Sequence, residues 1–244
     1  MDKVLEVKGL TKLYKNGRGA SDINLELKRG DVVGLLGPNG SGKTTIMKSI
    51  VGLIHANSGN VRIFGYDTIT DFEGAMEKVG CLIESPALYE FLTASDNLKL
   101  ASRYYANVNG QRIEDVLRIV HLDKYKKDKA GRFSLGMKQR LGLALALLSE
   151  PELLILDEPA NGLDIEGIVE IREIILKLAK EKGITFLISS HIAIEIEKTC
   201  NKVVVLHEGE TLSSDSMEDA LKRSPTLEDY YLEKVREKRG PIEL

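Results

Sequence analysis

The sequence lacks tryptophan, has only two cysteines and is poor in aromatic residues. Phe, Trp and Tyr make up 5% of the 244 residues, against 43% hydrophobic and 29% charged residues. This balance is typical of soluble α/β proteins rather than of aromatic-rich binding modules. Cys81 and Cys200 stand far apart and belong to no paired motif, which argues against a disulfide framework or a zinc site and favours a reducing compartment. We expect both cysteines to be small core residues.

The sequence also lacks a large charge excess and a long apolar run. Its net charge is -3, so there is no global electrostatic attraction to nucleic acid and we expect no such partner. No window reaches the roughly 18 consecutive apolar residues that a membrane-spanning helix needs. The first residues, MDKVLEVKGL, are charged and carry no signal-peptide apolar region. We expect a cytoplasmic chain that reaches a membrane only through another protein.

Short apolar runs alternate with helical patterns along most of the chain. The runs VVGLL, LLILD, ITFLISS and KVVVL are typical of buried strands, and strands separated by helices predict an α/β fold with a parallel sheet. Alternating residues in VLEV and INLEL predict strands near the N-terminus, where we expect an antiparallel arrangement.

The middle third of the chain is mainly helical. The apolar spacing predicts helices at about 98–105, 113–120 and 137–148. We therefore expect one α/β domain over residues 1–215, with a helical lobe at about 86–150 inserted in it. Residues 216–244 mix both charge signs with few apolar residues, and we expect them to form a helical tail at the surface.

The segment LLGPNGSGKTT lies between a predicted strand and a helix expected at about 44–53. Gly37, four residues, then Gly42, Lys43 and Thr44 match the P-loop pattern in full. In such a loop the backbone N–H groups curl around phosphate oxygens, the lysine reaches the outer phosphates and the threonine hydroxyl suits Mg²⁺. A plain glycine-rich turn is the alternative. The context on both sides favours binding of a nucleoside triphosphate.

Two adjacent carboxylates end the apolar run LLILDEP. A P-loop needs a carboxylate at the end of another buried strand to hold the metal, and Asp157 has that place. Glu158 follows it directly and suits a group that polarises the attacking water. The alternative is that one of the two caps the helix expected around 165–180.

Three further motifs narrow the prediction: FSLGMKQRLGLALALL, then LLILDEPANGLD, then LISSH. Together with the P-loop they resemble the nucleotide-binding subunit of ATP-binding cassette (ABC) transporters over nearly the whole chain and in the expected order. The resemblance implies a P-loop NTPase fold that binds ATP and Mg²⁺ and hydrolyses ATP. It assigns ATP binding to the residues of the Walker A loop, which are Gly37, Pro38, Asn39, Gly40, Ser41, Gly42, Lys43, Thr44 and Thr45.

The resemblance also implies roles for single residues outside that loop. Tyr14 matches the aromatic residue that stacks on adenine, although a tyrosine there can also be a packing residue. Asp157, with Thr44, matches the magnesium ligand, and Glu158 matches the catalytic base. His191 matches the histidine that contacts the γ-phosphate and helps to orient water; its alternative is a surface histidine at a strand end.

The resemblance departs from the family pattern at the signature element, usually Leu-Ser-Gly-Gly-Gln. This chain has Leu135 and Met137 in that element, while Ser134 and Gly136 are retained. In the family this element serves the ATP of the opposite subunit, which implies a dimer of identical or different ATPase subunits. Asp164 in PANGLD matches the acidic residue of the loop that joins the two sites.

A separate integral membrane permease follows from the same resemblance. It implies that the permease docks at about 86–106 and that the protein is peripheral on the inner face of the cell membrane. LIESPALYEFLTASDNLKL and the signature region look most like exporters of peptide antibiotics of the bacitracin and lantibiotic kind. A soluble ABC ATPase without a transport role and a nucleotide-sensing module that does not turn over are the two alternatives.

Glu84 in GCLIES stands where the family has a Gln that reaches Mg²⁺ and water. The resemblance therefore implies that Glu84 is an oxygen ligand of the metal, with a negative charge that the Gln lacks. The alternative is a carboxylate that marks the point where a strand reaches the surface before Pro86.

Overall fold

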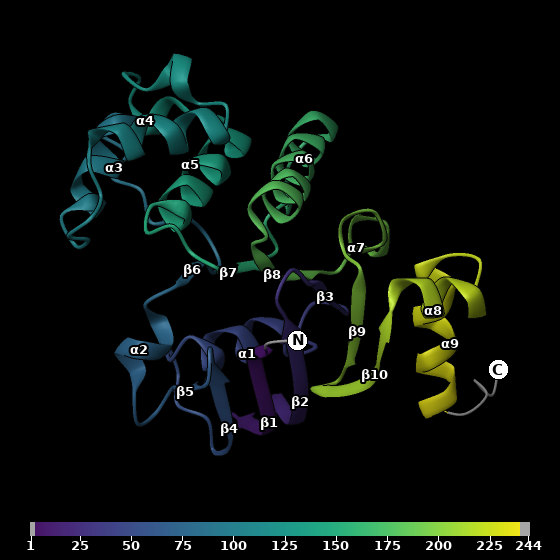
Figure 1. Cartoon of the computed structure of the whole chain (residues 1–244). Helices are drawn as coiled ribbons and strands as arrows, with labels where there is room; N and C mark the ends of the chain where they lie inside the picture. Colours follow the sequence, from purple (N-terminus) through teal and green to yellow (C-terminus); the bar gives the residue numbers. More distant parts are fainter. Residues whose placement is uncertain (1–2, 240–244) are drawn as a thin grey trace.

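Two β-sheets and a group of helices make up the structure, a computed structural model that describes residues 3–239 (Figure 1). The smaller sheet is antiparallel with the order β2-β1-β4-β5. Its strands are β1 (Lys3–Leu13), β2 (Gly19–Lys28), β4 (Ser58–Ile63) and β5 (Tyr66–Asp67). The expected antiparallel N-terminal strands are thus present, and they form a sheet of their own.

The larger sheet has the order β10-β9-β3-β8-β7-β6. Its first five strands along the chain run parallel and β10 pairs antiparallel at one edge. The strands are β3 (Val32–Leu36), β6 (Val79–Leu82), β7 (Leu153–Asp157), β8 (Thr185–Ser190), β9 (Lys202–His207) and β10 (Glu210–Ser216). The parallel sheet predicted from the alternating pattern is confirmed.

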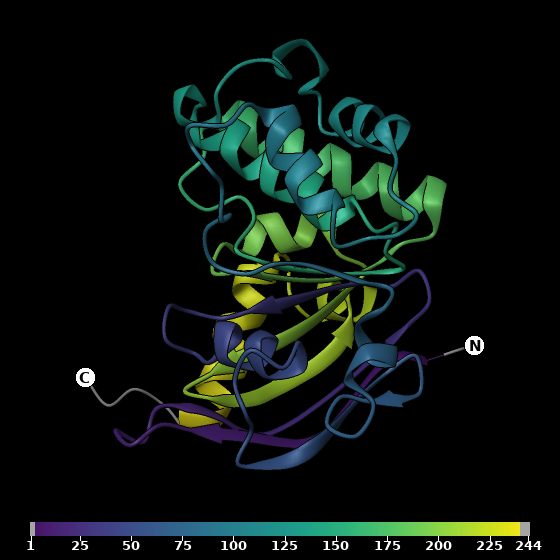
Figure 2. The ribbon, with the colours of Figure 1, turned by 90° about the vertical axis from the view of Figure 1, so that its left-hand side faces the viewer.

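Side chains of the central strands alternate between two apolar clusters. On β3, Val33 and Leu35 face one cluster while Val32 and Leu36 face the other, because successive side chains of a strand point to opposite faces. Helix α1 (Lys43–Ile50) fills the first cluster between the two sheets (Figure 2). A sheet buried on both faces requires continuous apolar strands, which is the pattern that the sequence shows.

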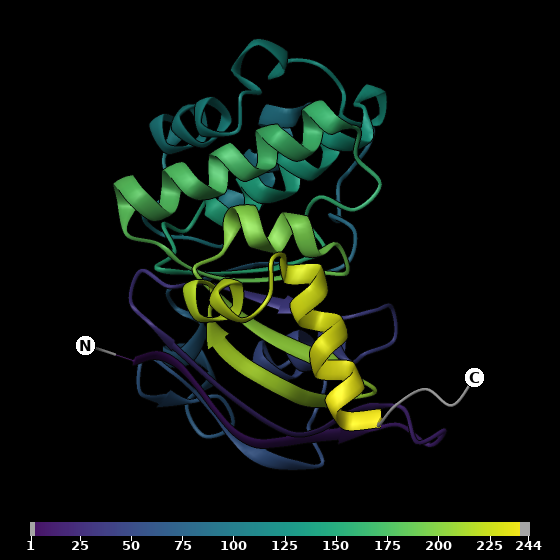
Figure 3. The ribbon, with the colours of Figure 1, turned by 90° about the vertical axis from the view of Figure 1, so that its right-hand side faces the viewer.

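Helices of the second cluster cover the other face of the large sheet (Figures 2 and 3). They are α3 (Ala94–Ser102), α4 (Gly110–Ile119), α5 (Leu135–Leu147), α6 (Ile165–Lys182) and α7 (Ala193–Thr199), with the short 3-10 helices η1 (Asp123–Tyr125) and η2 (Ala130–Arg132). A short helix that the sequence did not predict, α2 (Phe72–Met76), lies beside the antiparallel sheet (Figure 1). Within residues 3–239, no helix has the length and apolar character that crossing a bilayer requires.

The three helices expected in the middle third begin earlier than the apolar spacing predicts. Each begins after a polar cap whose side chain accepts a backbone N–H from the first turn: Thr93 at 3.1 Å, Asn109 at 3.0 Å and Ser134 at 3.2 Å. A cap satisfies an N–H group that the helix itself leaves unpaired. The polar first turns therefore belong to the helices although they carry no apolar signal.

The C-terminal helices α8 (Met217–Arg223) and α9 (Leu227–Arg239) lie against the body of the protein (Figure 3). Leu227 and Tyr230 are fully buried in the second apolar cluster. The Tyr230 hydroxyl lies 3.1 Å from Ser213 Oγ and donates to Asp215 Oδ2 at 2.5 Å, both on β10. The helices expected in the tail are present, with one face exposed and with Leu227 and Tyr230 packed into the core; residues 240–244 of that expectation lie outside the described range.

The two cysteines differ in their surroundings. Cys200 is buried as expected, and burial raises the pKa of its thiol. Cys81 on β6 is exposed, contrary to the expectation of a core residue. β6 is the last strand of the sheet, with Gly80 and Leu82 facing inward and Cys81 on the opposite face.

Tyr230 provides a test of the tail's contribution to stability. Tyr230→Ala is expected to lower the free energy of unfolding by about 3–5 kcal/mol, the range for truncating a fully buried large aromatic side chain. Tyr230→Phe, which removes only the hydroxyl, is expected to cost about 1 kcal/mol. Tyr104 is 86% exposed, so Tyr104→Ala is the control and should stay within about 0.5 kcal/mol of the parent in urea unfolding. Equal effects of Tyr230→Ala and Tyr104→Ala would contradict the buried packing.

Candidate functional site

The loop between β3 and α1 depends on its glycines. Gly40 and Gly42 have φ angles of +85° and +99°, the left-handed region that glycine adopts without steric cost. A Cβ on Gly37 would stand 2.3 Å from the carbonyl oxygen of Leu206 on β9, which no side chain allows. The glycine pattern that predicted a phosphate loop therefore has a direct conformational reason.

An open hollow of about 290 Å³ lies beside this loop. Its lining residues are Tyr14, Asn16, Arg18, Gly19, Asn39, Gly40, Gly42, Lys43, Thr44, Thr45 and Glu158. Tyr14 is thus brought to the loop from the turn between β1 and β2, as its predicted role requires. Arg18 belongs to the same turn and adds a cation that the sequence does not reveal, because a single arginine in a polar turn carries no motif.

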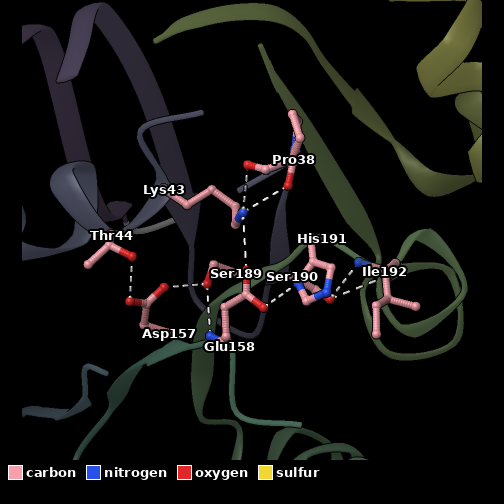
Figure 4. Close-up of polar contacts among 10 residues, drawn as sticks. Pro38, Lys43, Thr44, Asp157, Glu158, Ser189, Ser190, His191 and Ile192 are labelled. Carbon is pink, nitrogen blue, oxygen red and sulfur yellow. Dashed lines mark hydrogen bonds and ion pairs between the residues drawn. The ribbon is translucent and has the colours of Figure 1, made fainter. Parts of the chain in front are cut away.

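Lys43 is held by carbonyl oxygens of the loop and by a carboxylate. Its Nζ donates to the backbone oxygens of Gly37 at 2.8 Å and Pro38 at 3.2 Å, and lies 3.1 Å from Glu158 Oε1 (Figure 4). The Lys43 side chain is 5% exposed and that of Glu158 17%. A charged group so shielded from water needs a partner of opposite sign, and Glu158 supplies it.

Asp157 lies at the end of β7, where both of its carboxylate oxygens accept hydrogen bonds. Thr44 Oγ1 donates to Oδ2 at 2.7 Å and Ser189 Oγ donates to Oδ1 at 2.6 Å (Figure 4). Ser189 Oγ also accepts the N–H of Glu158 at 2.9 Å. The sequence indicates this serine only as a neighbour of the histidine, whereas in the structure it hydrogen-bonds to both carboxylate residues.

Neither Asp157 nor Glu158 caps α6, so that alternative is wrong. The cap is Asp164, whose Oδ1 accepts the N–H of Gly167 at 2.9 Å. The Thr44 hydroxyl and the Asp157 carboxylate instead converge on one point beside the loop. Oxygen donors of this kind, few in number and next to a phosphate site, fit Mg²⁺.

Glu158 and His191 are in direct contact. His191 Nδ1 lies 2.5 Å from Glu158 Oε2 (Figure 4). Glu158 has a φ angle of +49°, an unfavourable conformation for a residue with a side chain, of the kind that clusters at functional sites. The Glu158 carboxylate therefore joins Lys43 on one oxygen to His191 on the other.

Glu84 follows β6 and reaches α1 rather than the carboxylates of β7. Its Oε1 lies 2.6 Å from Lys48 Nζ, and its side chain is 63% exposed. The hydrogen bond that Lys48 donates to Glu84 raises the pKa of Lys48, an effect that desolvation partly opposes and to which the charge of Asp157 adds. Glu84 is thus tied to the helix that begins with Lys43 and Thr44.

The predicted signature residues lie outside the hollow. Ser134 caps α5, and neither it nor Gly136 or Asp164 is among the lining residues. Leu135, which departs from the family pattern, is 50% exposed. One chain therefore brings together Tyr14, the loop, Asp157 and Glu158, with His191 joined through Glu158, but leaves this second set apart.

Comparison with known proteins gives several matches. A family profile described as ABC transporter matches residues 20–161. The bacitracin transport ATP-binding protein BcrA of Bacillus licheniformis is 42% identical over 232 residues, which are 95% of this chain and 76% of the relative. The lantibiotic transport ATP-binding protein SrtF of Streptococcus pyogenes is 40% identical over 209 residues, which are 86% of this chain and 89% of the relative.

Solved structures agree with these matches. An ATP-binding subunit of an ABC transporter superposes with a TM-score of 0.84 at 33% identity, over 95% of this chain and 99% of the other. A dimeric ATP-binding cassette in a post-hydrolysis state with ADP and Pi has a TM-score of 0.77 at 27% identity, over 87% of this chain and 98% of the other. The predicted fold is confirmed, and the chain belongs to the ABC transporter family as an ATP-binding protein that hydrolyses ATP.

Proposed function

We propose that this ATPase powers a separate membrane permease that exports a peptide antibiotic or a similar amphipathic compound. The contact chain from Lys43 through Glu158 to His191 is the observation that carries the hydrolytic part. The relatives named for bacitracin and lantibiotic transport support the class of cargo. ABC ATP-binding subunits pair with permeases and dimerise, so we place the protein on the inner face of the cell membrane.

The phosphate loop holds the nucleotide. Its backbone N–H groups and the N-terminus of α1 face the phosphates, and the Ser41 hydroxyl is buried without a hydrogen-bond partner within residues 3–239. Lys43 exchanges its contacts to Gly37, Pro38 and Glu158 for contacts to the outer phosphates. Tyr14 stacks on the adenine at the open edge of the hollow.

Thr44 and Asp157 hold Mg²⁺, which when bound neutralises charge on the phosphate oxygens. Loss of the Lys43 contact frees one Glu158 oxygen to accept a proton from the attacking water. His191 keeps the other oxygen in place and thereby orients the carboxylate. Because both groups lie in contact, a module that only senses nucleotide is disfavoured.

The signature residues serve a second subunit. Ser134 and Gly136 lie at the N-terminus of α5, whose partial positive charge favours an anion. Since they lie outside this chain's hollow, we assign them, with Asp164, to the nucleotide bound by a partner ATPase, identical or different. Each hydrolysis event is then coupled to closing and opening of the dimer.

The permease docks on the segment at about 86–106. Tyr89 and Phe91 there are 52% and 69% exposed, and their rings lie 6.0 Å apart at 74° to one another. Exposed aromatic pairs on a polar surface are typical of partner sites. Glu84 precedes this segment and contacts Lys48 of α1. We therefore propose that Glu84 couples docking of the permease to the metal site.

The catalytic assignment is tested with Glu158→Gln. We expect the release of phosphate to fall at least 100-fold, the scale of a lost general base, while ATP binding remains and an ATP-bound dimer accumulates. Glu166→Gln on the first turn of α6 is the control, because Glu166 is acidic and exposed and lies outside the hollow. Normal turnover of Glu158→Gln would disprove the assignment.

Magnesium titration of the ATPase activity tests Glu84. We expect a stronger Mg²⁺ dependence in the parent than in Glu84→Gln, because the carboxylate brings a negative charge to the helix that begins with Lys43 and Thr44. Lys48→Met is the matched variant: it removes the ion pair at 2.6 Å but keeps the Glu84 charge. Indistinguishable titrations of the parent and Glu84→Gln would contradict a metal role.

Copurification from membranes tests the transport role. The tagged protein should bring down an integral membrane permease, and replacing Tyr89 and Phe91 by Ala should abolish this while ATPase activity persists. Tyr125→Ala is the control, since Tyr125 is 45% exposed on η1, outside the proposed segment. Absence of any membrane partner would favour a soluble ATPase without a transport role.

A further inference from the structure

An ion pair shielded from water joins α6 to α7. Arg172 Nη2 lies 3.1 Å from Oε1 and 2.9 Å from Oε2 of Glu195. The two side chains are only 18% and 16% exposed. Arg172 Nε is buried and has no hydrogen-bond partner within residues 3–239, and Glu195 contacts the guanidinium through Nη2. Pairs shielded in this way are weakly screened and favour one geometry.

Each of the two helices follows one of the groups proposed for catalysis along the chain. α6 begins after its cap Asp164, at the end of the short loop that follows Glu158. α7 begins at Ala193, just after His191, and the N–H of Glu195 donates to the carbonyl of Ile192 at 3.2 Å. Figure 3 shows α7 lying alongside α6. A shift of either helix therefore moves the segment that carries Glu158 or His191.

Packing between the two helices leaves a cavity of about 30 Å³. Its apolar lining comes mainly from isoleucines, which are Ile168, Ile171, Ile175, Ile188, Ile192 and Ile196. Glu158 and His191 line it together, and Arg172 and Glu195 line it as well. Apolar contacts are non-directional, so these two polar contacts set the relative position of the helices around the cavity.

We propose that Arg172 and Glu195 are positioning residues for ATP hydrolysis. Their ion pair holds α7, and with it His191, at the distance that keeps His191 in contact with the Glu158 carboxylate. The inference rests on the proposed roles of Glu158 and His191. Displacements of about 1 Å in a catalytic arrangement can cost about 100-fold in rate, so a partly buried pair beside the site affects turnover.

The test measures steady-state ATP hydrolysis by the full chain. Arg172→Met is expected to lower kcat about tenfold or more and to leave KM for ATP within about twofold, because the hollow beside the phosphate loop does not include either residue. Arg172→Lys keeps the charge and one donor and should restore part of kcat. Arg118→Met is the control: Arg118 pairs with Asp115 at 3.1 Å on α4, with side chains 68% and 40% exposed.

The double variant Arg172→Met with Glu195→Met distinguishes loss of the link between the helices from the destabilising effect of an unpaired Glu195 carboxylate. Removing Arg172 alone leaves the Glu195 carboxylate unpaired, which lowers stability. The double variant should regain thermal stability but keep the low kcat, because the link between the helices is still missing. Recovery of kcat together with stability would show a merely structural role and overturn the inference.

Two other results would also overturn it: a parental kcat in Arg172→Met, or a rise in KM that accounts for the whole loss. Failure of the proposed function is a different outcome, in which Glu158→Gln turns over like the parent.

Discussion

The Asp157 carboxylate is the junction on which the site depends. β7 and β8 pair in a register that sets Asp157 beside Ser189. The Ser189 hydroxyl donates a hydrogen bond to one carboxylate oxygen of Asp157, and the Thr44 hydroxyl donates to the other. The same serine holds the N–H of Glu158. One strand register therefore places Asp157, the phosphate loop and Glu158, the proposed metal ligand, nucleotide site and catalytic base, relative to one another. Each of these groups would be misplaced by a slip of one residue, since a slip reverses the faces of a strand.

The sequence predicts those parts of the site in which the local backbone conformation itself requires the residues of the motif. The glycines of the loop are needed by its own backbone, as the positive φ angles of Gly40 and Gly42 show. Asp157 ends an apolar strand, and parallel strands bring their carboxyl ends to one edge. The paired strands, the loop and α1 are predicted for the same reason, because each depends on residues adjacent in the chain.

What the sequence does not reveal depends on partners distant along the chain. Arg172 and Glu195 are ordinary charged residues of two amphipathic helices until the fold brings them together. Tyr230 is one aromatic residue in a polar segment, so the burial of the tail carries no periodic signal. The capped first turns of α3 and α4 are likewise invisible to apolar spacing, since a cap acts through a hydrogen bond.

The C-terminal helices have a consequence for biosynthesis. The N–H of Leu227 donates to Glu197 on α7 at 2.8 Å, and the Tyr230 hydroxyl donates to Asp215 on β10. Because α7 is synthesised before α8 and α9, the face of α7 that they cover remains uncovered while the chain grows. The segment around His191 thus reaches its final packing late, after the phosphate loop and its sheet have already been made. The order of synthesis therefore separates the time at which the protein first has its phosphate loop from the time at which the segment of His191 is held by the helices that follow it.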